Sequence, residues 1–137
     1  MRLFLDANVV FSAAQNTDGR AAAIFDLCRK GHGTIMVSPH ALEEARRNID
    51  LKYPDARSKM ELLLDDIEVC QECSRENAEW AAAQRLPEKD APILGAAAQG
   101  KADLLVTGDR AHFGHLLGKT LRGVLIVTPA EAFARLL

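Results

Sequence analysis

Five short apolar runs, separated by longer segments of helical pattern, constrain the fold more than any other feature of this chain. The runs cover residues 3–5, 34–37, 67–70, 104–107 and 124–127. A strand that is apolar along its length is buried on both faces, which is typical of parallel strands with helices on each side. The alternation of strand and helix therefore predicts an α/β fold, with a central parallel sheet of about five strands and helices on both faces.

The segments between these runs carry the signals of helix starts and stops. Helices are predicted over about residues 18–30, 38–49, 55–64, 74–85 and 90–99, with a last one after residue 128. Ser38 followed by Pro39 is typical of an N-cap and a first helical residue. Gly31 and Gly100 are typical of the residues that follow a helix end.

Size and charge narrow the class of protein further. A chain of 137 residues suits one domain, and we expect it to span residues 1–137. The apolar runs are far shorter than the roughly 20 residues that cross a bilayer, and no secretory signal is visible at the N-terminus. We therefore expect a cytoplasmic protein that does not enter membranes. A net charge of −2 argues against a protein that coats nucleic acid, but allows an enzyme with a local basic rim.

Three carboxylates occur at positions where an α/β sheet binds ligands. Asp6 directly follows the first apolar run, and Asp109 follows the fourth by one glycine. Ligands of open parallel sheets bind beyond the carboxyl ends of the strands, where the direction of the connections switches. Asp90 opens a predicted helix and lies three and four residues before Ile93 and Leu94, which places it on the apolar face.

Each of these acids also has a purely structural interpretation. Asp6 could cap the turn after a strand, Asp90 is a good N-cap, and Asp109 could bond its own backbone in a turn. Three acids at sheet-end positions, without a matching set of inward bases, are hard to explain as three separate turns. An inward carboxylate is costly unless it is paired, protonated or bound to metal, and oxygen ligands suit Mg²⁺ or Mn²⁺.

Three motifs carry these acids: Leu3-Phe4-Leu5-Asp6-Ala7-Asn8-Val9, Lys89-Asp90-Ala91-Pro92-Ile93-Leu94, and Leu104-Leu105-Val106-Thr107-Gly108-Asp109 continuing to Phe113. In this order and at these spacings they resemble the motifs of the PIN-domain family, over essentially the whole chain. The resemblance is closest to single-domain bacterial members, which include the ribonuclease toxins of toxin–antitoxin pairs. It implies a three-layer fold and a metal-dependent endoribonuclease that hydrolyses RNA phosphodiester bonds with Mg²⁺ or Mn²⁺.

The resemblance also implies further site residues and partners. A fourth acid is expected on the helix after the second strand, where Glu44 fits the family position, although helical phase alone leaves Glu43 open. With it, Asp6, Glu44, Asp90 and Asp109 are the expected metal ligands and catalytic residues. Asn8, Ser38 and Thr107 fall where the family has polar support for the acids. An antitoxin protein and a second copy of the chain are the implied partners; whether one or two ions bind, and whether DNA is also cut, stays open.

Cations near the acidic motifs are candidates for contacts with substrate phosphates. Six of them lie on segments near the proposed site: Arg20, Arg46, Arg47, Lys89, Arg110 and Lys119. The selected candidates are Arg46, Arg47, Lys89 and Arg110. The histidines after Asp109, His112 and His115, are interpreted as surface residues. The apolar residues of the segment 46–64 exceed what one short helix face uses, so this segment is predicted to contribute to a protein-binding groove.

Rival functions make different demands on the same positions. A phosphatase of the haloacid-dehalogenase type needs Asp-x-Asp after its first strand, whereas this chain has Asp6-Ala7-Asn8. A non-catalytic phospho-receiver needs an aspartate after its third strand, where this chain has Cys70. A degenerate PIN module that only binds would lack an acid of the set, and none is missing. A metal-dependent ribonuclease is therefore the preferred prediction.

Overall fold

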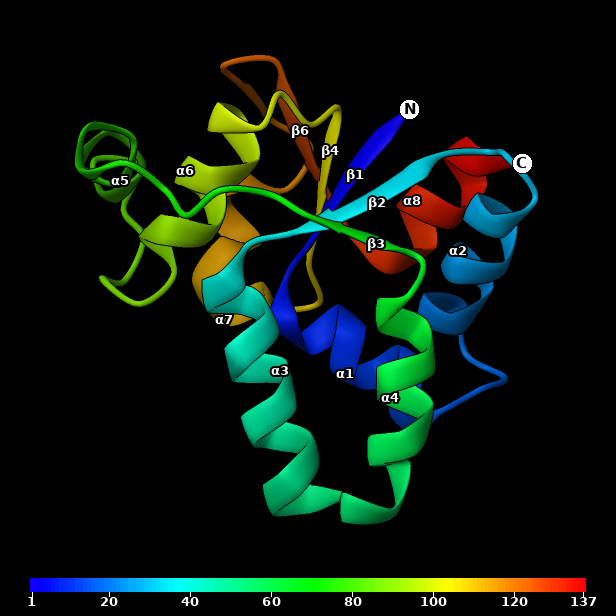
Figure 1. The fold of residues 1–137 in the computed structure, drawn as a ribbon. Helices are drawn as coiled ribbons and strands as arrows, with labels where there is room; N and C mark the ends of the chain where they lie inside the picture. Colours follow the sequence, from blue (N-terminus) through cyan, green and yellow to red (C-terminus); the bar gives the residue numbers. More distant parts are fainter.

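A six-stranded sheet crosses the middle of the molecule in the computed structural model, which describes residues 1–137 (Figure 1). The strand order is β3-β2-β1-β4-β6-β5, and every neighbouring pair is parallel except β5 and β6. The strands are β1 Arg2–Leu5, β2 Thr34–Val37, β3 Ile67–Val69, β4 Leu104–Val106, β5 Thr120–Leu121 and β6 Val124–Val127. The predicted α/β class and its mostly parallel sheet are confirmed.

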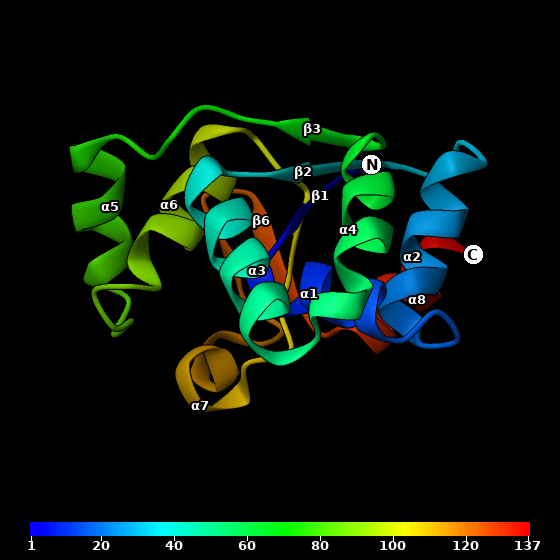
Figure 2. The ribbon, with the colours of Figure 1, turned by 60° about the horizontal axis from the view of Figure 1, so that its bottom comes forward.

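Helices cover both faces of this sheet. They are α1 Ala7–Gln15, α2 Arg20–Arg29, α3 Pro39–Lys52, α4 Arg57–Leu64, α5 Arg75–Ala82, α6 Ala91–Gln99, α7 Arg110–Phe113 and α8 Pro129–Leu136, with short 3-10 turns η1 Pro54–Ala56 and η2 Gly114–Leu116. Both views place α5 and α6 at one end of the molecule and α2 and α8 at the other (Figures 1 and 2). Helix α1 lies between α3 and α4 and contacts both. None of the helices has the length and apolar character needed to cross a bilayer.

The strands supply two separate apolar clusters because successive side chains point to opposite faces. Leu3 and Leu5 of β1 belong to the cluster under α1, α2, α3, α4 and α8, whereas Phe4 belongs to the cluster under α5, α6 and α7. Leu105 of β4 joins Phe4, and its neighbours Leu104 and Val106 join the other cluster. Burial on both faces is the property that the continuous apolar runs predicted, and these strands confirm it. For β3 the prediction is wrong, because β3 lies at the edge of the sheet, where Glu68 and Val69 are exposed.

Two elements next to the sheet were not predicted from the sequence. Helix α1 begins directly after Asp6, with no linker to separate its pattern from that of β1. Strand β5 has only two residues and returns into β6 through Arg122 and Gly123, both at positive φ of 49° and 83°. Two positive φ values in a two-residue loop suit a tight hairpin between twisted strands. The sheet therefore has an antiparallel edge strand beyond the five parallel ones expected.

The order of the strands creates a switch point between β1 and β4. The chain adds β2 and β3 on one side of β1, then crosses over to add β4 and β6 on the other side. Leu5 pairs with Val106, so the residues that follow these two strands lie side by side. The prediction that Asp6 and Asp109 follow neighbouring strands, with the first strand in the interior of the sheet, is confirmed.

Candidate active site

Asp6 is held at the end of β1 by three donors. Its Oδ1 accepts a hydrogen bond from the Ala7 amide at 2.7 Å, which caps α1, and its Oδ2 accepts from Asn8 Nδ2 at 3.0 Å and Thr107 Oγ1 at 2.8 Å. Only 4% of the residue is exposed. Burial raises the pKa of Asp6 to about 6, with hydrogen bonds from Thr107 and Ala7 opposing the rise and the charges of Glu44 and Asp90 adding to it.

The predicted supporting residues Asn8 and Thr107 connect the ends of the two neighbouring strands. Thr107 donates its hydroxyl proton to Asp6 and accepts the Asp109 amide at 3.1 Å. Asn8 donates to Asp6 and accepts the Gly108 amide at 3.0 Å through Oδ1. Since each side chain binds the Asp6 carboxylate and a backbone amide after β4, they fix the position of Asp6 relative to Asp109.

Asp90 is buried at the start of α6, but it does not cap that helix. Its backbone is already in the helical region, its side chain makes no capping hydrogen bond, and only 7% of the residue is exposed. Burial raises its pKa, the neighbouring charges of His112 and Lys89 lower it, and those of Asp109 and Glu44 raise it. The structural interpretation of Asp90 as an N-cap is therefore wrong, and its carboxylate needs another reason to be inside.

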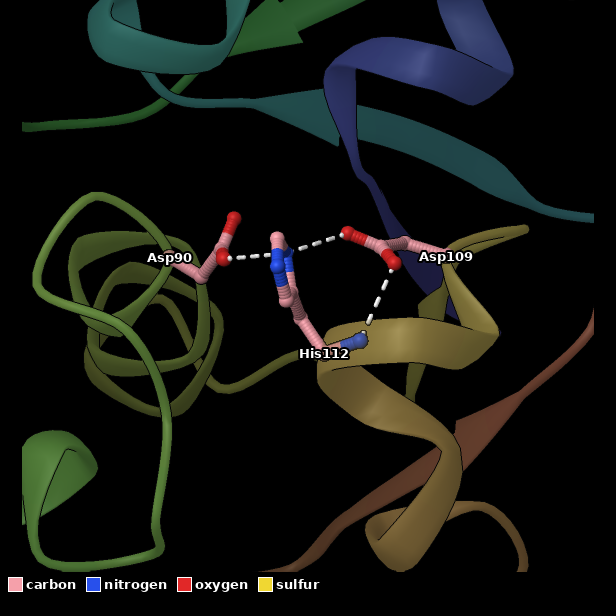
Figure 3. Close-up of side chains that lie close together, drawn as sticks. All are labelled: Asp90, Asp109 and His112. Carbon is pink, nitrogen blue, oxygen red and sulfur yellow. Dashed lines mark hydrogen bonds and ion pairs between the residues drawn. The ribbon is translucent and has the colours of Figure 1, made fainter.

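The imidazole of His112 lies between two of the predicted acids, as Figure 3 shows. His112 Nδ1 is 2.9 Å from an oxygen of Asp90 and 2.9 Å from an oxygen of Asp109. Despite these short distances, Asp90 Oδ2 and His112 Nδ1 are buried without any hydrogen bond of acceptable geometry. A buried polar group without a partner is costly, so this arrangement is satisfied poorly by the protein alone.

His112 is the site residue that sequence analysis missed. Its interpretation as a surface residue is wrong, because Asp109 caps α7 by accepting the His112 amide at 3.1 Å and thereby turns the imidazole back toward the acids. The signal in the sequence was the spacing Asp-x-x-His, which places both side chains on one face of a single helical turn. His115 is also partly buried, and its Nε2 lies 2.8 Å from the Gln84 carbonyl oxygen.

The two glutamates that helical phase could not separate differ in their surroundings. The side chain of Glu43 is 77% exposed and pairs with Arg47 at 3.3 Å. Glu44 is partly buried on α3, has no ion-pair partner, and its charge contributes to the raised pKa of both Asp6 and Asp90. Glu44 thus faces the acids while Glu43 faces solvent. Ser38 caps α3 by accepting the Ala41 amide at 3.1 Å, and it makes no hydrogen bond to the acids.

The four predicted substrate-binding cations divide into two pairs. Arg46 lies 3.4 Å from Glu61 and Arg47 pairs with Glu43, so both are already next to a carboxylate. Lys89 and Arg110 are exposed, flank Asp90 and Asp109 in the chain, and form no ion pair. The carbonyl of Lys89 accepts from His40 Nε2 at 3.1 Å, which ties the residue before Asp90 to the first turn of α3.

The donor set of the cluster fits a divalent cation. One atom each from Asp90, Asp109 and His112 lies within 4.8 Å of the others, and two of these atoms have no hydrogen-bond partner. Carboxylate oxygens suit Mg²⁺ and Mn²⁺, and an imidazole nitrogen favours the transition metal of the two. Asp6 and Glu44 are not part of this tight group, but their charges act on it from the β1 and α3 sides.

Three solved structures resemble this chain along nearly its whole length. VapBC2 from Rickettsia felis bound to a DNA fragment from their promoter has a TM-score of 0.69 and 19% identity, covering 93% of this chain and 98% of that one. PAE2754 from Pyrobaculum aerophilum has a TM-score of 0.70 and 16% identity, and the match covers 99% of this chain and 95% of that one. FitAcB from Neisseria gonorrhoeae has a TM-score of 0.61 and 16% identity, and the match covers 93% of this chain and 98% of that one. At these identities the likeness shows the fold.

Comparison by sequence gives a second and independent result. No curated protein matches the chain. A family model described as "PIN domain" matches residues 2–111, which contain Asp6, Glu44, Asp90 and Asp109. The match covers well over half of the chain, and the fold agrees with it. The chain belongs to the PIN-domain family.

Proposed function

We propose that residues 1–137 form one nuclease domain, a metal-dependent endoribonuclease that acts in the cytoplasm. PIN-domain proteins are generally nucleases. The observation that carries the proposal is the group of Asp90, Asp109 and His112 at the switch point of the sheet, where two buried polar atoms have no partner. Buried charge of this kind is retained where a cation or a reaction requires it.

Each residue of the proposed site has a separate role in phosphodiester hydrolysis. Asp6, Glu44, Asp90 and Asp109 would hold one or two divalent cations, with His112 as a further ligand. When bound, such a cation lowers the pKa of water and offsets the charge that develops on the phosphate. Asn8 and Thr107 keep the Asp6 carboxylate directed into the site. Ser38 anchors the helix that carries Glu44. In the reaction, a water molecule releases one proton to solvent as its oxygen bonds to phosphorus, and the bond from phosphorus to the leaving ribose oxygen breaks as that oxygen takes up a proton.

The test is cleavage of RNA by the purified chain with Mn²⁺ or Mg²⁺, repeated with excess chelator. We expect cleavage that depends on the metal and is lost in Asp90→Asn. Glu43→Gln is the matched control, because it removes an exposed carboxylate from the same helix as Glu44 and should leave the rate unchanged. Metal-independent cleavage, or equal losses in Glu43→Gln and Glu44→Gln, would contradict the proposed site. Calorimetry that detects no metal binding would favour a non-catalytic binding module.

A protein partner is part of the proposal, and the segment 46–64 is the proposed contact. Within it Met60 and Leu63 are buried in the monomer, whereas Leu51 is 75% and Leu62 68% exposed. The segment is thus only partly used by the core. We propose that the exposed leucines contact an antitoxin-like protein, by analogy with the two-component VapBC2 assembly. Co-expression with a protein encoded beside this chain, using wild type and Leu51→Ser/Leu62→Ser, tests this contact. Sedimentation of the chain alone tests for the expected homodimer.

A further inference from the structure

A cavity of about 330 Å³ adjoins the acidic cluster, and it is lined by basic side chains rather than carboxylates. It is lined by Arg85, Pro87, Ala111, His112 and His115, with no carboxylate among them. His112 belongs to both places, because its Nδ1 lies against Asp90 and Asp109 while the ring also lines the cavity. One imidazole therefore separates a site for cations from a cavity that carries a guanidinium.

The cavity is built by contacts between distant parts of the chain. Arg85 follows the end of α5 in a left-handed conformation, with φ of 62°. The preceding residue, Gln84, offers its carbonyl to His115 Nε2 at 2.8 Å. A carbonyl oxygen can only accept, so this ring nitrogen carries the proton. The bond joins the loop after α5 to η2, on which His115 lies, and holds the two walls of the cavity together.

Arg85 is the cation that lines this cavity, and its side chain is free. It is exposed and its guanidinium forms no ion pair or hydrogen bond within the chain, as with Lys89 and Arg110 but unlike Arg46 and Arg47, which already lie beside glutamates. His112 Nε2 likewise has no partner inside the protein, since only Nδ1 faces the acids. Arg85 was not among the cations selected from the sequence, although it lies only five residues before Asp90.

We propose that this cavity binds one nucleotide of the RNA strand, the one next to the scissile phosphate. The proposal rests on the nuclease function above. A guanidinium fork matches the oxygens of a phosphate, which gives Arg85 the role of phosphate-positioning residue. Bases of single-stranded RNA stack on histidine rings and similar flat surfaces, which His112, His115 and Pro87 supply. The volume lies at the lower end of the roughly 300–1,000 Å³ of ligand pockets, and suits a single nucleotide.

The position of Arg85 also reduces the electrostatic repulsion between the proposed RNA substrate and the acidic site. A strand of phosphates must approach a group of four carboxylates in a chain whose net charge is −2. A bound cation offsets this repulsion at the scissile phosphate only, and the phosphate beside it needs a separate positive partner. Arg85 provides one, because it lines the cavity on the other side of His112 from the acids. A nucleotide there would orient the strand before the reaction.

The experiment uses the full chain in excess chelator, so that its outcome does not depend on metal or on cleavage. Adenosine 5′-monophosphate, adenosine and inorganic phosphate are titrated separately at one pH, and the imidazole carbon-bound proton signals of His112 and His115 are followed by NMR. We expect saturable changes of both rings with adenosine 5′-monophosphate, and weaker binding of adenosine and of phosphate. Absence of a saturable change at His115 would overturn the proposal, as would equal affinity for phosphate alone.

Two arginine variants make the assignment specific. Arg85→Gln should weaken adenosine 5′-monophosphate binding by about tenfold or more, the effect expected for loss of a charge-assisted hydrogen bond. Arg135→Gln removes the same charge from an exposed position at the end of α8 and should leave the affinity unchanged. Equal affinities of Arg85→Gln and Arg135→Gln would refute the role of Arg85. If wild type binds the nucleotide but never cleaves RNA, the cavity stands and the nuclease proposal fails.

Discussion

The buried carboxylate of Asp6 should make the metal-free protein less stable at neutral pH than in mild acid. Its pKa is raised from an ordinary 3.8 to about 6, chiefly by burial. The folded state therefore binds this proton more tightly than the unfolded state does. The stability linked to it is fully present below about pH 4 and is lost as pH rises through about 6. This direction is opposite to that of carboxylates stabilised by ion pairs.

The size of the effect follows from the same pKa. A change from 3.8 to about 6 corresponds to roughly 3 kcal/mol of unfolding free energy over the whole titration, of which about 2 kcal/mol falls between pH 4.5 and pH 7.5. That is a large fraction of the 5–15 kcal/mol by which domains of this size are usually stable. Binding of a divalent cation at the site should remove most of this loss, because the ion stabilises the ionised carboxylate.

Urea unfolding between pH 4.5 and 7.5, with chelator and with Mn²⁺, measures both effects. Asp6→Asn is the reference, because asparagine keeps an acceptor for the Ala7 amide and cannot titrate. It should be less stable than wild type in acid, since its amide nitrogen cannot accept from Thr107 and Asn8. Over this pH range its stability should vary by about 2 kcal/mol less than that of wild type. Parallel curves for the two proteins would refute the reasoning that burial of this charge is costly. Mn²⁺ should stabilise wild type more at pH 7.5 than at pH 5.

Three further substitutions test separate parts of the structure. Asp90→Asn removes no helix cap, so the melting temperature should stay the same or rise. Its affinity for Mn²⁺, measured by calorimetry, and its rate of RNA cleavage should fall together by on the order of 10²-fold. Thr107→Val removes the hydroxyl that bridges Asp6 and the Asp109 amide; it should cost about 1–3 kcal/mol in urea unfolding, and an unchanged midpoint would count against the bridge. Gly95→Ala would bring a Cβ against Cys73 Sγ and the Asn77 carbonyl; crowding between α5 and α6 should cost about 1–3 kcal/mol, whereas wild-type stability would mean that α5 is free to shift.

The parts of the fold that the sequence predicts are those in which burial is complete. Strands β4 and β6 and residues 3–5 of β1 are apolar throughout because both faces are covered, and this pattern can be recognised without knowing the neighbours. The acids at the ends of β1 and β4 could be located for the same reason, since a carboxylate directly after such a run is conspicuous. Strand β5 has no pattern to recognise, because two residues cannot show a period.

The parts of the site that the sequence does not predict depend on packing between distant segments. Glu43 and Glu44 are adjacent on one helix, and only the position of α3 against the sheet decides which of them faces the acids. Asp90 looks like a helix cap in the sequence, yet its backbone geometry leaves the side chain free for the site. Arg85 and His115 meet across a cavity formed by two loops that share no motif.

His112 shows how a single packing contact changes the chemistry that a set of acids can perform. Four carboxylates alone form a hard oxygen site, for which Mg²⁺ is the natural ion. The turn that Asp109 caps adds an imidazole nitrogen 2.9 Å from two of the acids. A nitrogen donor favours Mn²⁺ over Mg²⁺ in the usual order of metal affinities. It also leaves the opposite side of the ring lining the cavity of Arg85. In the proposed site, the same residue would couple the choice of metal to the position of the neighbouring nucleotide, and neither effect can be deduced from the acids alone.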